Sequence, residues 1–316
     1  MLTPGKAGIV YHRGAGRGRA QALVPQVRKS LETAGWQVVD IEPTRRADQA
    51  RTELAPYLAG RADLIVVVAG DGTLREICAG LEEAAIQRAI GFVPTGNANV
   101  VARDQGIPLD PAAAIRLLTT GTLRRLDVGR LRRNPDRDAG TLFLAMVEIG
   151  FGARVVALAH RLRDGKHGVL YHRWGDALYL AAALKALFSP EESPLRVWWN
   201  GAPAPLEAMA AIVANTRCYA KGWAVAPEAR MDDGQLDLVA RLKSGPGAIA
   251  RAYCAAARAR RPPLAISRCR RGRRFAFQSE ARLAVQVDGD PMPPLKWMEI
   301  DVLPGRLSLI APHGSS

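Results

Sequence analysis

The sequence lacks the features that mark membrane-spanning, secreted and disulfide-stabilised proteins. It has no continuous apolar run approaching the roughly 20 residues that a transmembrane helix needs. Its first residues, MLTPGKAGIVYH, are too interrupted to form the apolar segment of a signal peptide. The four cysteines, at positions 78, 218, 254 and 269, have neither paired nor metal-type spacing, so we expect reduced thiols. Together these absences predict a cytoplasmic protein.

Acidic residues are scarce relative to basic ones. The chain has 30 Asp and Glu against 44 Lys and Arg, which gives a net charge of +14. Arginine is densest in RARRPPLAISRCRRGRRFAF, residues 258–277. Such a segment attracts nucleic acid or lipid headgroups, although a solvated charged loop has the same composition. Because no recognition-helix, zinc-finger or aromatic-rich RNA motif accompanies it, we expect an anionic membrane surface and no specific nucleic-acid partner.

The order of the apolar segments predicts two domains. With 316 residues and 48% hydrophobic content, the chain can bury a full core. Within residues 1–126, four expected strands alternate with helices, which is typical of a doubly wound α/β domain. Within residues 127–316, short apolar runs between turn residues predict a mostly antiparallel β domain, interrupted by a helix over 175–189.

The stretch LIVVVAGDGTLREICAGL, residues 64–81, combines a strand, a glycine turn and a helix. Leu64 to Ala69 reads as a strand covered on both faces, and apolar residues then recur at helical spacing. Asp71 lies between two glycines, where backbone N–H groups and the helix dipole favour phosphate. A carboxylate repels a bare phosphate, so Mg²⁺ or a substrate hydroxyl would have to lie between them. The alternative is that Asp71 caps the following helix.

Two further expected strands also end in glycine-containing loops, RGAGRGRA and PTGNAN. In a doubly wound sheet these loops lie at one edge, so the glycines could converge on one phosphate chain: Gly14, Gly16, Gly70, Gly72 and Gly96. A dinucleotide site with Asp40 or Glu42 as ribose ligand fits less well, because the third glycine of GAGRGRA comes one place early. The chain also lacks the G-K-[ST] of a P-loop.

Several motifs, in order along the chain, carry a resemblance to a known family. They are AGDGT, VPTGNANVVAR, EIGFGA, ANTRCYAKGWAVAPEARMDDGQLDLV and VDGDP. They resemble the motifs of the diacylglycerol kinase catalytic-domain family, which includes bacterial diacylglycerol kinases, YegS-like proteins and sphingosine kinases. The resemblance implies an N-terminal α/β domain like that of NAD kinases, a C-terminal β-sandwich domain, and ATP with Mg²⁺ bound between them.

The resemblance also implies roles for individual residues. Contacts to ATP are expected from His12, Arg13, Gly14, Ala15, Gly16, Thr44, Ala69, Gly70, Asp71, Gly72, Thr73, Leu74, Arg75, Gly96 and Asn97. In RMDDGQ, Asp233 would bind Mg²⁺ through its carboxylate, and Arg230 and Gln235 through backbone carbonyls. Without the family, Asp232-Asp233-Gly234 reads as an ordinary acidic turn.

The implied reaction is transfer of the γ-phosphoryl group of ATP to a lipid hydroxyl, a step of phospholipid metabolism. Asp71 and Asp290 are both candidates for the base that accepts the hydroxyl proton, with Asp288 supporting the same cluster. Diacylglycerol, sphingoid base, ceramide and polyprenol all remain open as acceptors. The chain would act as a peripheral enzyme at an anionic membrane, and whether it forms a homodimer is left open.

The helix expected over 175–189 has an apolar face made of Leu178, Leu180, Ala181, Leu184 and Leu187. This face would either border the site of the acyl chain or belong to the core.

Four positions depart from the family pattern. Ala69 replaces a glycine, Arg75 stands where Asn is usual, Asn97 replaces a threonine, and Asp290 replaces a glutamate. The Asp290 carboxylate is one methylene, about 1.5 Å, shorter in reach. These departures support one alternative to the lipid kinase, a catalytically impaired member that binds nucleotide or membrane. A second alternative is a kinase of a soluble substrate such as NAD, which the glycine-loop Asp favours and the second domain disfavours.

Overall fold

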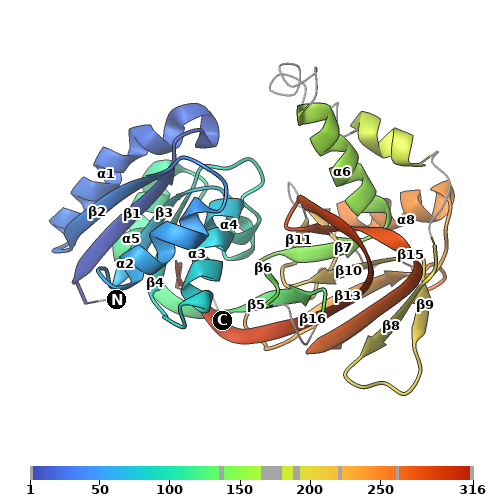
Figure 1. The fold of residues 1–316 in the computed structure, drawn as a ribbon. Coiled ribbons are helices and arrows are strands. Elements are labelled where there is room, and N and C mark those ends of the chain that lie inside the picture. Colours follow the sequence, from blue (N-terminus) through green and yellow to red (C-terminus); the bar gives the residue numbers. More distant parts are fainter. Residues whose placement is uncertain are drawn as a thin grey trace.

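The N-terminal domain is built on a parallel sheet (Figure 1). The computed structural model describes residues 3–134, 139–164, 180–187, 193–219, 223–258, 260 and 263–313. The strands lie in the order β2 (Gln37–Thr44), β1 (Lys6–His12), β3 (Leu64–Ala69) and β4 (Ala89–Pro94). All neighbouring strands in this set are parallel, so their carboxyl ends share one edge.

Helices cover both faces of this sheet, as the fully buried strand β3 requires. Leu64, Val66 and Val68 pack beneath α1 (Arg19–Thr33) and α5 (Pro111–Thr120). Ile65 and Val67 point to the other face, toward α2 (Ala55–Ala59) and α3 (Asp71–Glu83). The domain is therefore doubly wound, as predicted. Shorter helical elements are η1 (Ala15–Gly18), η2 (Ala50–Leu54) and α4 (Val100–Asp104).

The C-terminal domain is mostly antiparallel and curls around its own core. Residues such as Phe143, Val197, Leu238, Phe275 and Ile300 fill the interior of this sandwich. Its strands are β6 (Thr141–Phe143), β7 (Met146–Ile149), β8 (Leu195–Trp199), β9 (Leu206–Ala208), β10 (Ala210–Ala214), β11 (Cys218–Tyr219), β12 (Trp223–Ala224), β13 (Leu236–Arg241), β14 (Ser267–Gly272) and β15 (Arg274–Val287).

Two long strands run through both domains. The predicted boundary after residue 126 falls inside β5 (Thr122–Arg132), which pairs with β16 (Asp290–Ala311) on both sides of that point. Near its end, β16 also pairs in parallel with β4 at Ser308 and Leu309. The last strand therefore returns to the N-terminal sheet, and one sheet of 14 strands spans the described chain.

The helical content of the C-terminal domain is larger than the sequence suggested. Helices α6 (Phe151–Asp164) and α8 (Pro246–Ala257) were not expected, whereas of the helix expected over 175–189 the structure describes 180–187. Leu178 lies outside the described residues. In 180–187 the buried residues are Ala182 and Ala186, whereas Leu180 and Leu184 are exposed. The predicted apolar face is therefore largely turned to solvent.

Two further expectations concern the membrane and the cysteines. Among the described helices, none is long and apolar enough to cross a membrane. All four cysteines are free, and burial raises the pKa of Cys78 to about 12.

Candidate active site

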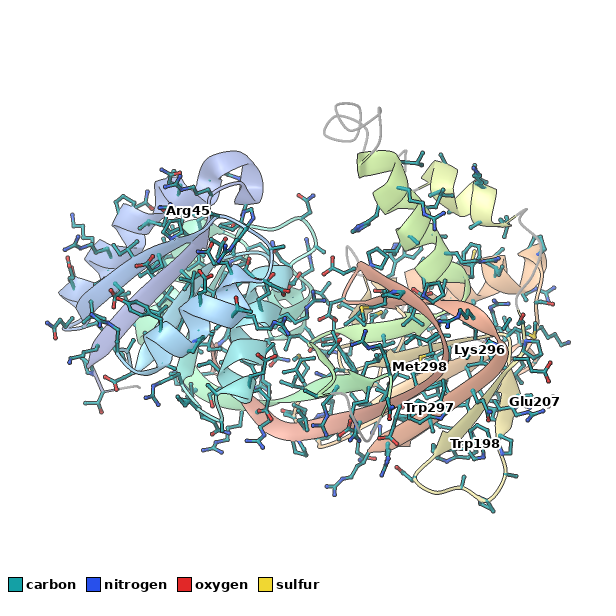
Figure 2. The ribbon with its side chains drawn as sticks, in the orientation of Figure 1. Arg45, Trp198, Glu207, Lys296, Trp297 and Met298 are labelled. Carbon is teal, nitrogen blue, oxygen red and sulfur yellow. The ribbon has the colours of Figure 1, made fainter. Side chains whose placement is uncertain are left out.

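Three loops at the carboxyl edge of the N-terminal sheet approach one another closely. A Cβ atom on Gly96 would lie 2.8 Å from the Cα of Gly70, and one on Gly16 would lie 2.8 Å from the carbonyl oxygen of Thr95. Gly16 also has a φ of +59°, which disfavours residues with a side chain. The predicted convergence of the glycine loops is therefore confirmed for the loops after β1, β3 and β4. Arg45, directly after β2, lies at the same edge (Figure 2).

Buried polar atoms at this edge lack protein partners. Three buried side-chain oxygens among the described residues have no hydrogen-bond partner. They are the hydroxyls of Thr44 and Thr95 and the amide oxygen of Asn99. Native proteins rarely leave such atoms unsatisfied. An edge that combines these atoms with the N-terminus of α3 fits a polar, anionic ligand such as a nucleotide.

The other residues predicted to contact ATP divide into three groups, of which one, Ala15 and Thr73, is half-buried. His12, Arg13, Gly14, Gly72 and Asn97 are exposed at this edge. The side chains of Ala69 and Leu74 are fully buried in the core, so only their backbones can face a ligand. Sequence reasoning missed Thr95 and Asn99, although both lie in the PTGNAN stretch that it had singled out.

Asp71 caps a helix, although not the one it begins. Its Oδ2 accepts a hydrogen bond from the backbone N–H of Val100 at 2.9 Å, and its Oδ1 accepts one from Val101 at 3.2 Å. Both oxygens are thus directed to the N-terminus of α4, about 30 residues further along the chain. Burial raises the pKa of Asp71, the two N–H donors oppose this rise, and the nearby charge of Asp288 adds to it.

Asp288 belongs to the tight turn between β15 and β16. It has a φ of +50° and Gly289 a φ of +90°, the left-handed pair that two-residue hairpin turns favour. The carboxylate of this half-buried residue accepts hydrogen bonds from the backbone N–H groups of Leu144, Ala145 and Met146 at 2.8–2.9 Å. Burial raises the pKa of Asp288, while the charge of Arg75 and these three donors oppose the rise.

Arg75 connects α3 to this turn of the other domain. Its Nη2 lies 2.5 Å from Oδ2 of Asp290, and its Nη1 donates to the carbonyl of Val287 at 3.0 Å. The Arg75 side chain is 16% exposed and that of Asp290 is 54% exposed. Two of the four departures from the family pattern therefore contact each other. The contact brings Asp288 and Asp290 to the first turns of α3, near Asp71.

A second ion pair joins the domains at the far end of α4. Asp104, nearly buried, accepts a hydrogen bond from the backbone N–H of Arg217 at 2.9 Å, and the Arg217 guanidinium donates to the Asp104 carbonyl at 3.1 Å. Burial raises the pKa of Asp104, and Arg217 opposes the rise. Helix α4 is thus capped by Asp71 of α3 at its N-terminus and contacts the C-terminal domain at its other end. Sequence reasoning gave no role to Arg217, which lies inside the ANTRCYAKG motif.

The RMDDGQ loop, in which Mg²⁺ was predicted, is held by other contacts. Oδ1 of Asp233 accepts a hydrogen bond from the N–H of Gln235, and its Oδ2 lies 3.7 Å from the Arg271 guanidinium. Asp232 pairs with Arg124 and Arg230. Among the described residues, no three His, Cys, Asp or Glu side chains are close enough to hold a metal ion. The predicted set has one carboxylate, Asp233, and the backbone carbonyls of Arg230 and Gln235, so this absence does not bear on it and the Mg²⁺ site stays a prediction.

Asp127, also missed from the sequence, fixes this loop to the domain junction. Its carboxylate accepts hydrogen bonds from the N–H of Gly234 at 2.6 Å and of Gly305 at 2.9 Å. Gly305 has a φ of +62° and lies where the register of β16 shifts.

A mostly apolar pocket lies between α8 and the sheet formed by β7, β10 and β13. Its apolar lining includes Phe151, Ile212, Val225, Val239 and Ala256. Its empty volume, which includes the solvent at its mouth, is about 560 Å³. Polar residues at the lining are Glu148, Arg241, Tyr253 and Ser267. Glu148 lies beside Gln286 on β15, two residues before the turn that contains Asp288.

The arginine-rich segment does not form one free basic surface. Arg271 pairs with Asp237 at 3.2 Å, Arg274 pairs with Glu299 at 2.5 Å, and Arg270 stacks on the Trp199 ring. Two other tryptophans, Trp198 on β8 and Trp297 on β16, lie at the end of the C-terminal domain away from the N-terminal one (Figure 2). Part of the predicted basic charge is therefore neutralised within the fold.

The predicted phosphate site can be tested at Gly72, in the first turn of α3. A Cβ there would meet no protein atom within 4 Å. We therefore expect Gly72→Ala to leave the melting temperature unchanged but to raise KM for ATP at least about tenfold, or about 1.4 kcal/mol of binding free energy. Gly247→Ala on α8, which has equally open space, is the matched control and should leave KM unchanged. If the two variants had the same KM for ATP, the phosphates of ATP would not bind beside Gly72.

Two family profiles together match most of the chain. "Diacylglycerol kinase catalytic domain" matches residues 6–131, and "YegS C-terminal NAD kinase beta sandwich-like domain" matches residues 145–311. The chain is 29% identical over 321 residues to "Probable lipid kinase YegS-like" of Pseudomonas aeruginosa strain PAO1, covering 97% of this chain and 94% of that protein. It is 32% identical over 221 residues to the protein of the same name from Pseudomonas putida, covering 69% and 70%.

Solved structures show the same fold. A crystal structure of a diacylglycerol kinase from Bacillus anthracis superposes with a TM-score of 0.70 at 20% identity, covering 97% of this chain and 96% of that one. Yeast NADH kinase complexed with NADH superposes with a TM-score of 0.51 at 9% identity, covering 99% and 85%. The predicted combination of an NAD-kinase-like α/β domain with a C-terminal β-sandwich is confirmed.

Proposed function

Because the chain belongs to the diacylglycerol kinase catalytic-domain family of lipid kinases, we propose that it transfers the γ-phosphoryl group of ATP to a lipid hydroxyl. The observation that carries this proposal is the Arg75 contact to Asp290 and Val287. It brings a carboxylate of the C-terminal domain to the N-terminus of α3, where a nucleotide phosphate would be stabilised. The N-terminal domain would thereby hold the phosphoryl donor, and the C-terminal domain would provide the proton acceptor.

Asp290 is the base in this proposal. The oxygens of Asp71 and Asp288 accept backbone hydrogen bonds, whereas the Asp290 side chain is more than half exposed and is oriented by Arg75. Asp290 accepts the hydroxyl proton while the lipid oxygen bonds to the γ-phosphorus, the bond to the β-phosphate oxygen breaks, and ADP leaves with that electron pair. Arg75 keeps the carboxylate in position, and Asp71 keeps α4 beside the phosphate loop.

Mg²⁺ would neutralise charge on the phosphates and would enter with ATP as part of the substrate. No step depends on the RMDDGQ loop, because Asp233 there faces Arg271 and closes its own turn. The proposed acceptor is an amphiphile, because the mostly apolar pocket offers a place for an acyl chain, and its lining residue Glu148 contacts Gln286, two residues before Asp288.

A kinase assay with an acceptor panel tests the proposal. Diacylglycerol, a sphingoid base, ceramide and polyprenol are presented in detergent micelles with radiolabelled ATP, and NAD is offered in parallel. We expect label in at least one lipid and none in NAD. Label in NAD alone would support the second candidate, which the yeast NADH kinase fold favours. ATP binding without any product would identify a member of the family that has lost catalysis.

A further inference from the structure

One helix of the C-terminal domain, residues 180–187, exposes two large apolar side chains. Leu180 is 62% exposed and Leu184 is 50% exposed, one turn apart on helix 180–187. On the opposite side of this helix Ala182 and Ala186 are buried, and Ala186 packs with Phe151 of α6 and Ile249 of α8. Exposed leucines at i and i+4 on a helix that is already anchored on its other side form an unpartnered apolar face.

Trp223 adds a third large apolar side chain to this region. It is 45% exposed and contacts Tyr253 edge to face, with ring centroids 6.0 Å apart. Tyr253 in turn contacts Phe151, and both line the apolar pocket beneath α8. The helical cap is defined here as α6, residues 180–187 and α8 (Figure 1), together with Trp223 of the adjoining β12. It exposes apolar side chains, and its residues Phe151 and Tyr253 line the pocket.

The charge of the helical cap indicates what covers its apolar face. Its exposed basic residues include Arg161, Lys185 and Arg251. Within the described residues of these three helices, Asp164 is the one acidic residue. An apolar face bordered by basic residues, with an amphipathic tryptophan nearby, matches the interface of an anionic bilayer.

We propose that the helical cap, through Leu180, Leu184 and Trp223, is the surface that docks on an anionic lipid bilayer. Docking in this way would place residues of the pocket lining at the membrane, so that an acceptor chain could move from the bilayer into the pocket. The inference rests on the proposed lipid kinase function. It also assigns docking to a different surface from the arginine-rich segment, in which Arg271 and Arg274 are paired internally.

Sedimentation with vesicles of phosphatidylcholine, with and without phosphatidylglycerol, tests this surface in the full chain. We expect binding to vesicles that contain phosphatidylglycerol, weakened by salt because screened charge contributes. The double variant Leu180→Ser, Leu184→Ser should reduce this binding at least about tenfold, since two apolar side chains no longer enter the interface. The matched control is Leu109→Ser, Leu123→Ser, because these leucines are 39% and 42% exposed and belong to the N-terminal domain.

Activity in micelles separates this inference from the proposed function. We expect the Leu180→Ser, Leu184→Ser variant to keep near wild-type activity with a short-chain acceptor in micelles and to lose activity on vesicles. Unchanged vesicle binding in that variant, or an equal loss in the control, would overturn the docking surface and leave the kinase proposal intact. Docking through the cap without phosphorylation of any lipid would instead overturn the kinase proposal. Dimers abolished by the variant, with vesicle binding unchanged, would show that a second copy covers the face.

Discussion

Asp290→Asn is expected to lower kcat for phosphoryl transfer by about 10²- to 10⁴-fold, the range for loss of a general base. The substitution keeps the size of the side chain and removes the charge that accepts the hydroxyl proton. Because Asp290 is 54% exposed, losing its ion pair with Arg75 should change the free energy of unfolding by no more than about 1 kcal/mol. Steady-state kinetics together with thermal melting measure both effects.

Glu83→Gln provides the matched control for this measurement. Glu83 is 50% exposed, pairs with Arg51 at 3.1 Å and lies at the opposite end of α3. Glu83→Gln should leave kcat within about twofold of the wild-type value, because it removes only a surface ion pair similar to that between Asp290 and Arg75. If Asp290→Asn retained near wild-type kcat, Asp290 would not be the base, and the role would return to Asp71.

Asp288→Ala is expected to act on stability. The variant leaves three buried N–H groups without an acceptor, and each unsatisfied group costs about 1–3 kcal/mol. The free energy of unfolding should therefore fall by at least about 3 kcal/mol, which corresponds to roughly 6–12 °C in the melting temperature of a domain of this size. Alanine is also disfavoured at the positive φ of this position.

Asp288→Asn separates the structural explanation from a chemical one. Asparagine tolerates the positive φ and can still accept the two hydrogen bonds that reach Oδ1, from Ala145 and Met146. The melting temperature should fall in the order wild type, Asn, Ala. Wild-type melting temperatures combined with a collapse of kcat in both variants would instead make Asp288 a direct participant in proton transfer.

Asp71 shows why a substitution should be judged from the structure. From the sequence, a capping role would make Asp71→Asn nearly silent, since Asn and Asp cap helices almost equally well. In the structure both oxygens accept N–H groups of α4, so an amide would direct its NH₂ at one of these donors. Loss of activity in Asp71→Asn therefore would not by itself identify a base, and Asp290→Asn is the more informative variant.

Local sequence determined the elements around the site. The β-branched run at 64–69, the glycines that follow and the helical spacing after them encode strand, turn and helix within 20 residues, so their order could be read directly. Parallel strands bring their carboxyl ends to one edge, which is why the convergence of the glycine loops was predictable. Helices α6 and α8 were missed because the turn-separated apolar runs of residues 127–316 predict strands, although the apolar periodicity of α6 is as strong as that of α1.

Tertiary structure alone decided which groups the acidic residues contact. Asp71 caps a helix 29 residues away, and Arg75 meets Asp290 across 215 residues. No periodicity encodes such pairs, because they depend on how two domains pack along β5 and β16. The same holds for helix 180–187: its sequence is apolar on several sides, and packing against α6 and α8 selected Ala186 for burial and left Leu180 and Leu184 in solvent.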